Sequence, residues 1–466
     1  MWQHQLFKEV NLCRLIFILF NMKKLVFGLF AALMVMMSSC GGSKEVQKIL
    51  TTIPRDTKAA IVVDFAKINE KLDKEGSGSL QELIISAFGN EMDAEARYFL
   101  GDESPIDFNS SAVFFEFNEE GVYTFYVKDP KVFRDALVEK CDMSLIEKDG
   151  VWCDEDNKIF QLDNQVWVAI SRYTLSASDV KDLASLSDSK SIMDLEAAKK
   201  MVDRNGDISF LGNLNAIGSS NREFAQMMMG LNMSFDDPAY VEADINFEEG
   251  KVVGSATILN SKGKIAKCAV SPSKIDMGEL KSFSGRGNAF LAFNVNASMM
   301  DQALSKVRNM GIPEMVTDIL GSLDGEIVIS GDIATIGSSV PSIDAMVTFD
   351  NASNASKYAS MANAILPEGI SLRADGRKMF LSIGNASGAG IESVADKFNG
   401  SAGGFAILLD QIPDPKVSVV SEFISAASII SKPAGDGVEM ELNIDTKPGQ
   451  NSLVTILKFA GMAKNF

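Results

Sequence analysis

Apolar and polar residues alternate with a period of two along two pairs of segments, one near the middle of the chain and one near its C-terminal end. The first pair is VEADINF (241–247) and SATILN (255–260), and the second is VEMELNI (438–444) and LVTILK (453–458). Glu-Glu-Gly and Lys-Pro-Gly lie between the members, so each pair is predicted to be a β-hairpin. Six positions are identical between the pairs, at offsets of 197 and 198 residues, which indicates an internal repeat.

The repeat continues towards the N-terminus with weaker matches. Two of the matched pairs combine a strand pattern with the start of a helix, and the third is a strand alone. These pairs are 59–68 with 288–297, 124–137 with 346–361, and 207–214 with 403–410. The offset falls from about 229 at the first pair to 197 at the closing hairpin, so the second copy is a shortened version of the first.

Helices are interspersed with hairpins and do not alternate singly with strands. This order predicts an α+β fold with two tandem related domains, each a mainly antiparallel sheet with helices packed on it. The first copy is expected to span residues 51–262 and the second residues 285–466, with a linker over residues 263–284.

Residues 22–39 have the pattern of an export signal. Two lysines precede thirteen uncharged residues, and two serines follow directly before Cys40, which is the order of a secretory signal. The apolar run is shorter than the roughly 20 residues of a transmembrane helix. Its end resembles the lipobox of bacterial lipoproteins, which implies acylation of Cys40 and a lipidated tether over residues 40–50. Residues 1–21 fit no part of this signal, so we expect translation to start at Met22 and residues 1–21 to be an upstream extension.

The chain is acidic, with 44 Lys and Arg, 62 Asp and Glu, and a net charge of −18. Residues 1–39 contain four of the basic and one of the acidic residues, so the mature chain would carry 40 basic and 61 acidic residues, a net −21. Such a body repels phosphate backbones, so nucleic acid is a poor partner. Membrane attachment is therefore expected through an acylated Cys40, because two or more acyl chains give a stable anchor.

The only histidine is His4, which lies in the predicted presequence. The mature chain would therefore lack Ser-His-Asp and Cys-His catalysis and His-ligated metal sites. The Asp-rich stretches 154–157 and 203–207 lack the Gly and Glu that an EF-hand loop requires, so no metal is predicted. The Gly-rich stretch 384–390 follows a predicted strand and precedes a helical pattern, but it lacks the lysine of a P-loop, so a flexible connection is favoured and no cofactor is expected. Carboxylate chemistry of the glycosidase kind stays open, but no pair can be assigned, and a non-enzyme is predicted.

Cys141, Cys153 and Cys268 remain besides Cys40. The turn Lys148-Asp149-Gly150 would place Cys153 near residue 145, roughly 13 Å along the strand from Cys141. A disulfide needs Cα atoms within about 7 Å, so an unbridged pair is favoured, although an oxidising compartment would permit the bridge.

The segment FAQMMMGLNM (224–233) is the one candidate for an apolar binding face. Its members are Phe224, Met227, Met228, Met229 and Met233. Methionine-rich surfaces are soft and suit varied partners. Ordinary core packing of a helix gives the same pattern and is the favoured interpretation, with the binding face as the alternative.

Three features together carry a family resemblance: the lipobox, the opening IPRDTKAAIVVDFAKINEKL (53–72) and the duplicated pattern. By these features the chain resembles a family of large Bacteroides-type envelope lipoproteins, which is catalogued only as a domain of unknown function. The resemblance implies an envelope location and supplies no catalytic residues. Residues 41–45 are Gly-Gly-Ser-Lys-Glu, without the acidic run that many surface-exported lipoproteins carry. The expected location is therefore the outer membrane, facing the periplasm.

Three classes of function follow. The favoured one is a non-catalytic binding or scaffold module whose partner is another envelope protein. The alternative is a carrier or receptor for a lipid or glycan that uses the Met-rich apolar helices. A carboxylate-based hydrolase is the least favoured of the three.

Overall fold

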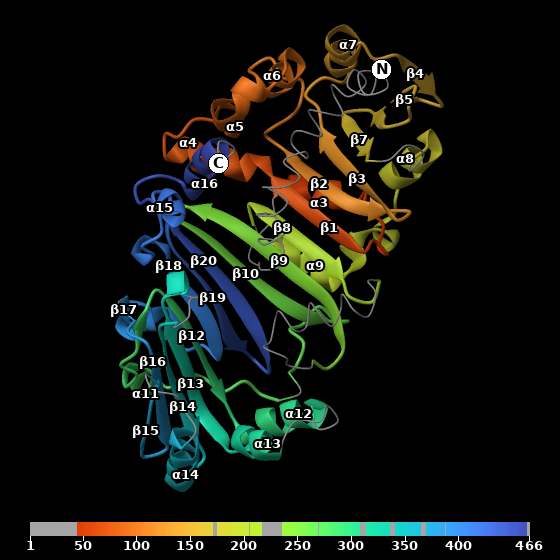
Figure 1. The fold of residues 1–466 in the computed structure, drawn as a ribbon. Coiled ribbons are helices and arrows are strands. Elements are labelled where there is room, and N and C mark those ends of the chain that lie inside the picture. The colour runs from red at the N-terminus through yellow and green to blue at the C-terminus, as the bar shows by residue number, and fades with distance from the viewer. Residues whose placement is uncertain are drawn as a thin grey trace, which may run out of the picture. The chain divides into compact units, whose positions relative to one another are not determined.

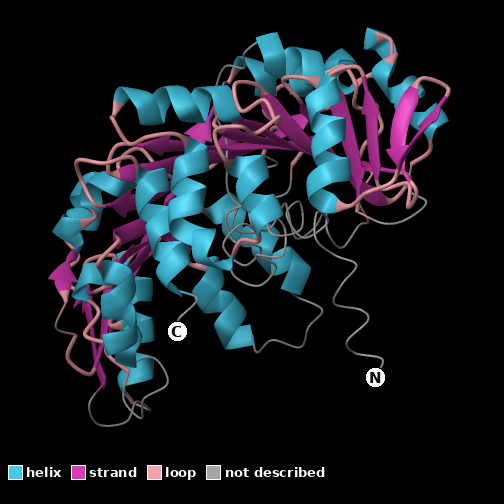
Figure 2. Ribbon diagram, turned by 90° about the horizontal axis from the view of Figure 1, so that it is seen from above, coloured by secondary structure: helices cyan, strands magenta, loops and turns pink. Residues whose placement is uncertain are grey.

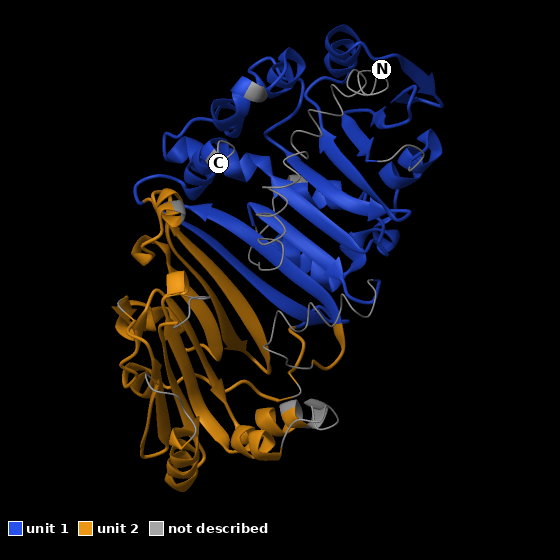
Figure 3. Ribbon diagram, in the orientation of Figure 1, with its two compact units in different colours: residues 1–222, 239–264, 448–466 blue, residues 223–238, 265–447 orange. Residues whose placement is uncertain are grey.

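The computed structural model describes residues 44–170, 175–204, 206–216, 235–268, 270–307, 314–335, 341–364, 370–386 and 388–463. The fold is α+β with antiparallel sheet, as predicted. The chain divides into two compact units, coloured in Figure 3: unit 1 comprises residues 1–222, 239–264 and 448–466, and unit 2 comprises residues 223–238 and 265–447. None of the helices in the described ranges has the length and apolar character needed to cross a bilayer.

Unit 1 has a sheet centred on β1 (Ala59–Asp64). β1 pairs with β2 (Ser111–Phe117) on one side and with β8 (Ile208–Asn213) on the other. Beyond β8 lie β9 (Pro238–Glu248) and β10 (Lys251–Asn260), joined by a two-residue turn. Beyond β2 lie, in order, β3 (Glu120–Tyr126), β7 (Gln165–Ala169), β6 (Ile159–Leu162), β5 (Val151–Asp154) and β4 (Leu145–Lys148).

Unit 2 repeats this strand order around β12 (Ala289–Val295). β12 pairs with β13 (Leu323–Gly331) and with β18 (Gly403–Leu408), which continues to β19 (Ile424–Ala434) and β20 (Gly437–Thr446). Beyond β13 lie β14 (Ile343–Phe349), β16 (Lys378–Ile383) and β15 (Ile370–Asp375). β11 (Arg286–Gly287) and β17 (Ala389–Gly390) form a separate small sheet. With β1 equated to β12, the order of unit 2 matches that of unit 1 without β4 and β5.

The pairing registers test the sequence matches directly. Ile61 of β1 lies opposite Phe210 of β8, and their matched residues Phe290 of β12 and Ala406 of β18 also lie opposite each other. The matches upstream of the closing hairpins therefore place equivalent strands together: β1 with β12, β3 with β14, and β8 with β18.

The match between the closing hairpins was wrong. VEADINF lies in β9, whose equivalent is β19, whereas VEMELNI lies in β20, one strand further on. The segment LVTILK, predicted as a strand, belongs to the helix α16 (Ser452–Ala463). A short apolar run fits a buried helix as well as a strand, because periodicity alone does not separate them.

Helices of unit 1 follow β1 and β3. Asp64 ends β1 and caps α4 (Phe65–Lys74), which is followed by α5 (Leu80–Phe88), the 3-10 turn η1 (Gly89–Glu91) and α6 (Ala94–Leu100). α7 (Pro130–Cys141) follows β3, and its first backbone N–H groups donate to Asp129. Asp is a favoured N-cap residue, and Pro is tolerated at the first helical position, where its missing N–H costs nothing. Side chains from α5, α6 and α7 form one core with β7; Figure 1 labels these elements in the N-terminal part of the chain.

The remaining helical segments of unit 1 are α3 (Lys44–Leu50), α8 (Ala177–Ala184), η2 (Asp188–Lys190), η3 (Ile192–Asp194) and α9 (Glu196–Asp203). α3 packs against β2, α9 against β8, and α8 against β5 and β6. Figure 2 shows the helices in cyan and the strands in magenta.

Among the described residues of unit 2, the buried apolar side chains form two clusters. The first joins α11 (Met277–Lys281) and the turns η6 (Ile391–Ser393) and η7 (Ala395–Phe398) to β12, β13 and β18. The second is formed with α13 (Glu314–Gly321) and α14 (Ala352–Asn363) around Phe349. α12 (Ala297–Val307), η5 (Ile333–Thr335), η8 (Leu409–Gln411) and α15 (Pro415–Ser421) complete the unit.

The three described cysteines carry free thiols. Cys141 ends α7, and Cys153 lies on β5 opposite Ile146. The prediction that the hairpin turn separates Cys141 from Cys153 is thus confirmed.

The C-terminal helix α16 belongs to unit 1 and packs on α5, with Leu457 and Ala460 in the core of that unit. A Cβ on Gly461 would lie 2.6 Å from the backbone oxygen of Ala87. We expect Gly461→Val to lower the free energy of unfolding by about 1–3 kcal/mol, because the two helices must separate.

Urea unfolding would measure this loss, with Met462→Ala as the control on an exposed neighbour. A Gly461→Val protein as stable as the wild type would contradict the close contact of α16 with α5.

Candidate functional site

One of the connections that differ between the two repeat copies follows β7. In unit 1 the segment from the end of β7 to Ser191 is residues 170–190, and it contains α8 and η2. In unit 2 the corresponding segment, from the end of β16 to β17, is only residues 384–388. The equivalence follows from pairing, because Pro54 bridges Ser191 just as Arg286 of β11 pairs with Gly390 of β17.

This extra segment forms one wall of a pocket of about 710 Å³ in unit 1. The opposite wall comes from the residues before β1, and the ends of β2, β8 and β9 close it. Its lining residues are Pro54, Arg55, Asp56, Phe117, Asp179, Asp182, Leu183, Leu186, Ser189, Lys190, Leu195, Asn213 and Tyr240. A volume of this size is within the range of small-molecule and side-chain pockets.

The base of the pocket is apolar and its rim is polar. Leu183 is buried, while Phe117, Leu186, Leu195 and Tyr240 are half-buried. Around them stand exposed charged side chains, Arg55, Asp56, Asp182 and Lys190. This combination of an apolar base and a few polar groups is typical of binding sites.

Several polar groups at the pocket make no hydrogen bond or ion pair with the described residues. They are the carboxylates of Asp56 and Asp182, the ammonium of Lys190 and the hydroxyl of Tyr240. Arg55, by contrast, is paired with Asp194 at 2.8 Å. The carboxylate of Asp179 accepts hydrogen bonds from the backbone N–H and hydroxyl of Ser176 and so caps α8. The four groups without partners are available to a bound molecule.

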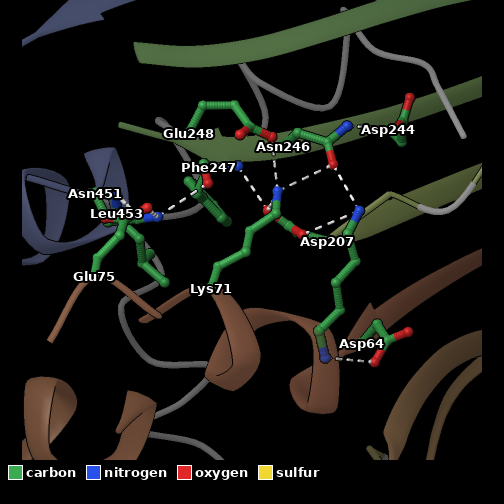
Figure 4. Close-up of polar contacts among 11 residues, drawn as sticks. Asp64, Lys71, Glu75, Asp207, Asp244, Asn246, Phe247, Glu248, Asn451 and Leu453 are labelled. Atoms are coloured by element: carbon green, nitrogen blue, oxygen red, sulfur yellow. Dashed lines mark hydrogen bonds and ion pairs between the residues drawn. The ribbon is translucent and has the colours of Figure 1, made fainter. Parts of the chain in front are cut away.

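A second polar constellation lies inside unit 1, at the other end of β8 and β9 (Figure 4). Asp207, directly before β8, is fully buried. Its carboxylate accepts a hydrogen bond from the backbone N–H of Phe247 at 2.6 Å and pairs with Lys71 at 2.9 Å and Lys67 at 3.3 Å. The Lys71 ammonium also contacts Glu248 at 2.8 Å. Both lysines project from α4, so this cluster fixes α4 to the ends of β8 and β9.

Asp244 of β9 extends this cluster. Its Oδ2 accepts a hydrogen bond from the Asn246 amide at 3.1 Å, and Asn246 in turn accepts one from Lys67. Oδ1 of Asp244 accepts none from the described residues. Burial raises the pKa of Asp244 to about 8, partly opposed by the positive charge of Arg204. This carboxyl is therefore mainly protonated at neutral pH.

Unit 2 has no counterpart of the cluster at the equivalent positions. The backbone N–H of Asp64 donates to the carbonyl of Asp207, and that of Asn294 donates to Ala402 in the same way. Ser209 of β8 lies opposite Asp244 of β9. At the equivalent place in unit 2, Gly404 of β18 lies opposite Ile430 of β19, which belongs to the apolar core. The buried polar cluster is therefore found in unit 1, while unit 2 has an apolar side chain, Ile430, at the position equivalent to Asp244.

The contacts within the cluster hold α4 against the ends of β8 and β9. The carboxylate of Asp207 is in contact with two ammonium groups and a backbone N–H, and none of the cluster residues lines the pocket. Among the described residues, no group of three or more His, Cys, Asp or Glu side chains is placed to hold a metal ion.

The structure does not describe the residues singled out from the sequence. Cys40, Phe224, Met227, Met228, Met229 and Met233 all fall outside the described residues. The pocket was not predicted, since its lining residues come from six separate parts of the chain. The sequence signal closest to it is the fall in the repeat offset, from 222 (Thr124 to Met346) to 196 (Asp207 to Gly403), an interval that contains residues 170–190 together with β4 and β5.

Comparisons with known proteins add little. No family model matches the chain, and no curated protein does. Two solved structures of the protein TP0453 are similar to it: crystal form I has a TM-score of 0.28 and 9% identity, covering 46% of this chain and 80% of that one. Crystal form III has a TM-score of 0.21 and 8% identity, covering 74% and 96% respectively. Similarity of this degree supports no argument about function.

Proposed function

We propose that the chain is a non-catalytic binding protein of the bacterial envelope, held to the periplasmic face of the outer membrane by acylated Cys40. The observation that carries the binding role is the pocket of unit 1, formed by a segment that the second copy of the fold lacks. The anchor and location rest on the signal pattern of residues 22–40 and on the resemblance to Bacteroides-type envelope lipoproteins.

The comparison between copies supports a binding role for this segment. Residues 384–388 of unit 2 join the same strands in five residues, so the fold does not need α8 and η2 to close its sheet. In unit 1, α8 packs on β5 and β6, while the polar groups of this segment that lack partners face the pocket, where a ligand can use them.

In-cell photo-crosslinking would test this role. A photoreactive residue replaces Leu186 in the full-length lipoprotein, and a matched variant carries it at exposed Met361 in unit 2. We expect one envelope protein to be crosslinked reproducibly from position 186 and not from position 361. Equal labelling from both positions, or none from position 186, would count against the pocket as the binding site.

A carrier for a lipid is the second candidate, and one face of the unit 2 sheet favours it. Two adjacent rows of side chains cross seven strands on this face without a polar member. One row is Leu381, Ala345, Ile329, Leu291, Phe405, Ile429 and Leu442, and the other is Ile383, Ile343, Gly331, Ala289, Ile407, Ala427 and Ile444. Phe405 is 37% exposed and most of its neighbours are half-buried. Such a surface suits acyl chains.

Native mass spectrometry of the anchor-free chain, purified gently from the periplasm, separates the two candidates. The carrier role predicts a lipid adduct that is lost on denaturation and reduced in Phe405→Asp, with Ile170→Asp in unit 1 as the matched control on an exposed apolar residue. A bare mass in the wild type would leave the protein-binding role.

A further inference from the structure

We propose that the pocket of unit 1 binds a segment of a partner protein in which a basic side chain lies next to a large apolar one. This inference rests on the proposed binding function and specifies the chemistry of the partner. It follows from the charges at the rim, the nature of the base and the groups that have no partner among the described residues.

The charge balance of the rim favours a cationic group. Three lining carboxylates, Asp56, Asp179 and Asp182, face two lining cations, Arg55 and Lys190. Arg55 is already neutralised by Asp194 outside the lining, which leaves Lys190 against three carboxylates. A phosphate or carboxylate ligand would meet this excess negative charge, whereas a Lys or Arg side chain complements it.

The apolar base can hold the rest of such a segment. Leu183, Leu186 and Leu195 provide a surface for an aliphatic or aromatic anchor, as in pockets at protein interfaces. Phe117 and Tyr240 add two aromatic rings to the lining. Aromatic faces attract Lys and Arg, and the methylene stem of a basic side chain packs on apolar surface while its charge stays at the rim.

The size and openness of the site fit a peptide segment. About 710 Å³ accommodates two or three large side chains, and the charged groups without partners are exposed at the mouth. The acidic charge of the whole chain, −18, acts in the same direction because it accelerates encounter with basic partners. Neutral sugars could use the aromatic rings and hydrogen-bonding groups, but the excess of carboxylates gives them no advantage.

A random heptapeptide display library, selected on the anchor-free protein, tests the proposal without a known partner. We expect the selected peptides to be enriched in Lys or Arg beside Leu, Phe, Tyr or Trp. A fluorescein-labelled synthetic copy of the most frequent peptide would then be titrated into each variant by anisotropy at 150 mM NaCl.

The variants separate the pocket from general electrostatic attraction. Asp56→Lys with Asp182→Lys changes two rim charges, and Asp102→Lys with Glu155→Lys makes the same change in net charge at exposed positions of unit 1 outside the pocket. We expect the first pair to weaken binding at least tenfold and the second less than twofold. Leu186→Asp should weaken it to a similar degree as the first pair, and circular dichroism would verify that each variant is folded.

Three results would overturn the proposal. The first is that the library yields acidic peptides or no consensus. The second is that Asp56→Lys with Asp182→Lys and Asp102→Lys with Glu155→Lys weaken peptide binding equally. The third is that the wild type binds selectively to glycans on an array and that Asp56→Lys with Asp182→Lys loses this binding. A peptide that binds equally to all pocket variants would place the interaction elsewhere on the chain and leave the proposed binding function standing.

Discussion

Replacing Asp207 by alanine is expected to lower the free energy of unfolding of unit 1 by about 3–5 kcal/mol, because removal of one partner leaves buried charge uncompensated. Asp207 is fully buried, and the ammonium groups of Lys67 and Lys71 and the backbone N–H of Phe247 all contact its carboxylate. Asp207→Asn keeps an acceptor for Phe247 but no charge for the lysines, so its loss should be smaller.

The measurement is urea unfolding together with hydrogen exchange of the α4 amides. Lys67→Met and Lys71→Met added to Asp207→Ala should restore much of the stability, since no unpaired charge is then buried. Asp324→Ala serves as the control, because its carboxylate is half-exposed and lies 3.9 Å from Arg377. A loss below 1 kcal/mol in Asp207→Ala, with unchanged exchange in α4, would show that the cluster does not hold the helix.

Asp244→Asn is expected to raise the free energy of unfolding at pH 8, and this gain over the wild type should become smaller as the pH falls. The carboxyl has a pKa near 8 when folded and an ordinary value of 3.8. Between these values the folded state holds a proton that the unfolded state does not, so the stability of the wild type falls as the pH rises from about 4 to about 8. The greatest slope is about 1.4 kcal/mol per pH unit. Asparagine resembles the protonated carboxyl and does not titrate, so the variant lacks this decline.

The difference in unfolding free energy between Asp244→Asn and the wild type, measured by urea at pH 5, 6, 7, 8 and 9, checks the expectation. The difference should grow up to about pH 8 and then level off. Glu155→Gln, at an exposed turn, should show no such trend. A constant difference from pH 5 to pH 8 would mean that Asp244 is ionised throughout, and the raised pKa would be wrong.

Local pattern was enough to predict the fold class and most of the duplication. The order of a strand leading directly into a helix, as over residues 59–68 and 124–137, depends on neighbouring residues only, and the structure has both where the sequence predicts them. α16 was mistaken for a strand because six apolar-rich residues fit both states, and its packing on α5 from more than 350 residues away decides between them.

The polar cluster could not be predicted for the same reason. Alternation along β9 is typical of a strand with one face in water, yet Glu242 and Asp244 are buried. Lys71 comes from 136 residues before Asp207, and Lys67 from 179 residues before Asn246. A polar strand position becomes an interior one only through such distant partners, and no short stretch of sequence contains that information.

The return of α16 to unit 1 has a consequence for how the protein is made. Asn451, just before this helix, donates hydrogen bonds to Glu75 and to the carbonyl of Phe247, so the last segment joins α4 to β9. During synthesis every residue of unit 2 leaves the ribosome before α16 does. Unit 1, although it begins first, therefore completes its core last, and its earlier segments must stay competent to fold until residues 452–463 have been made.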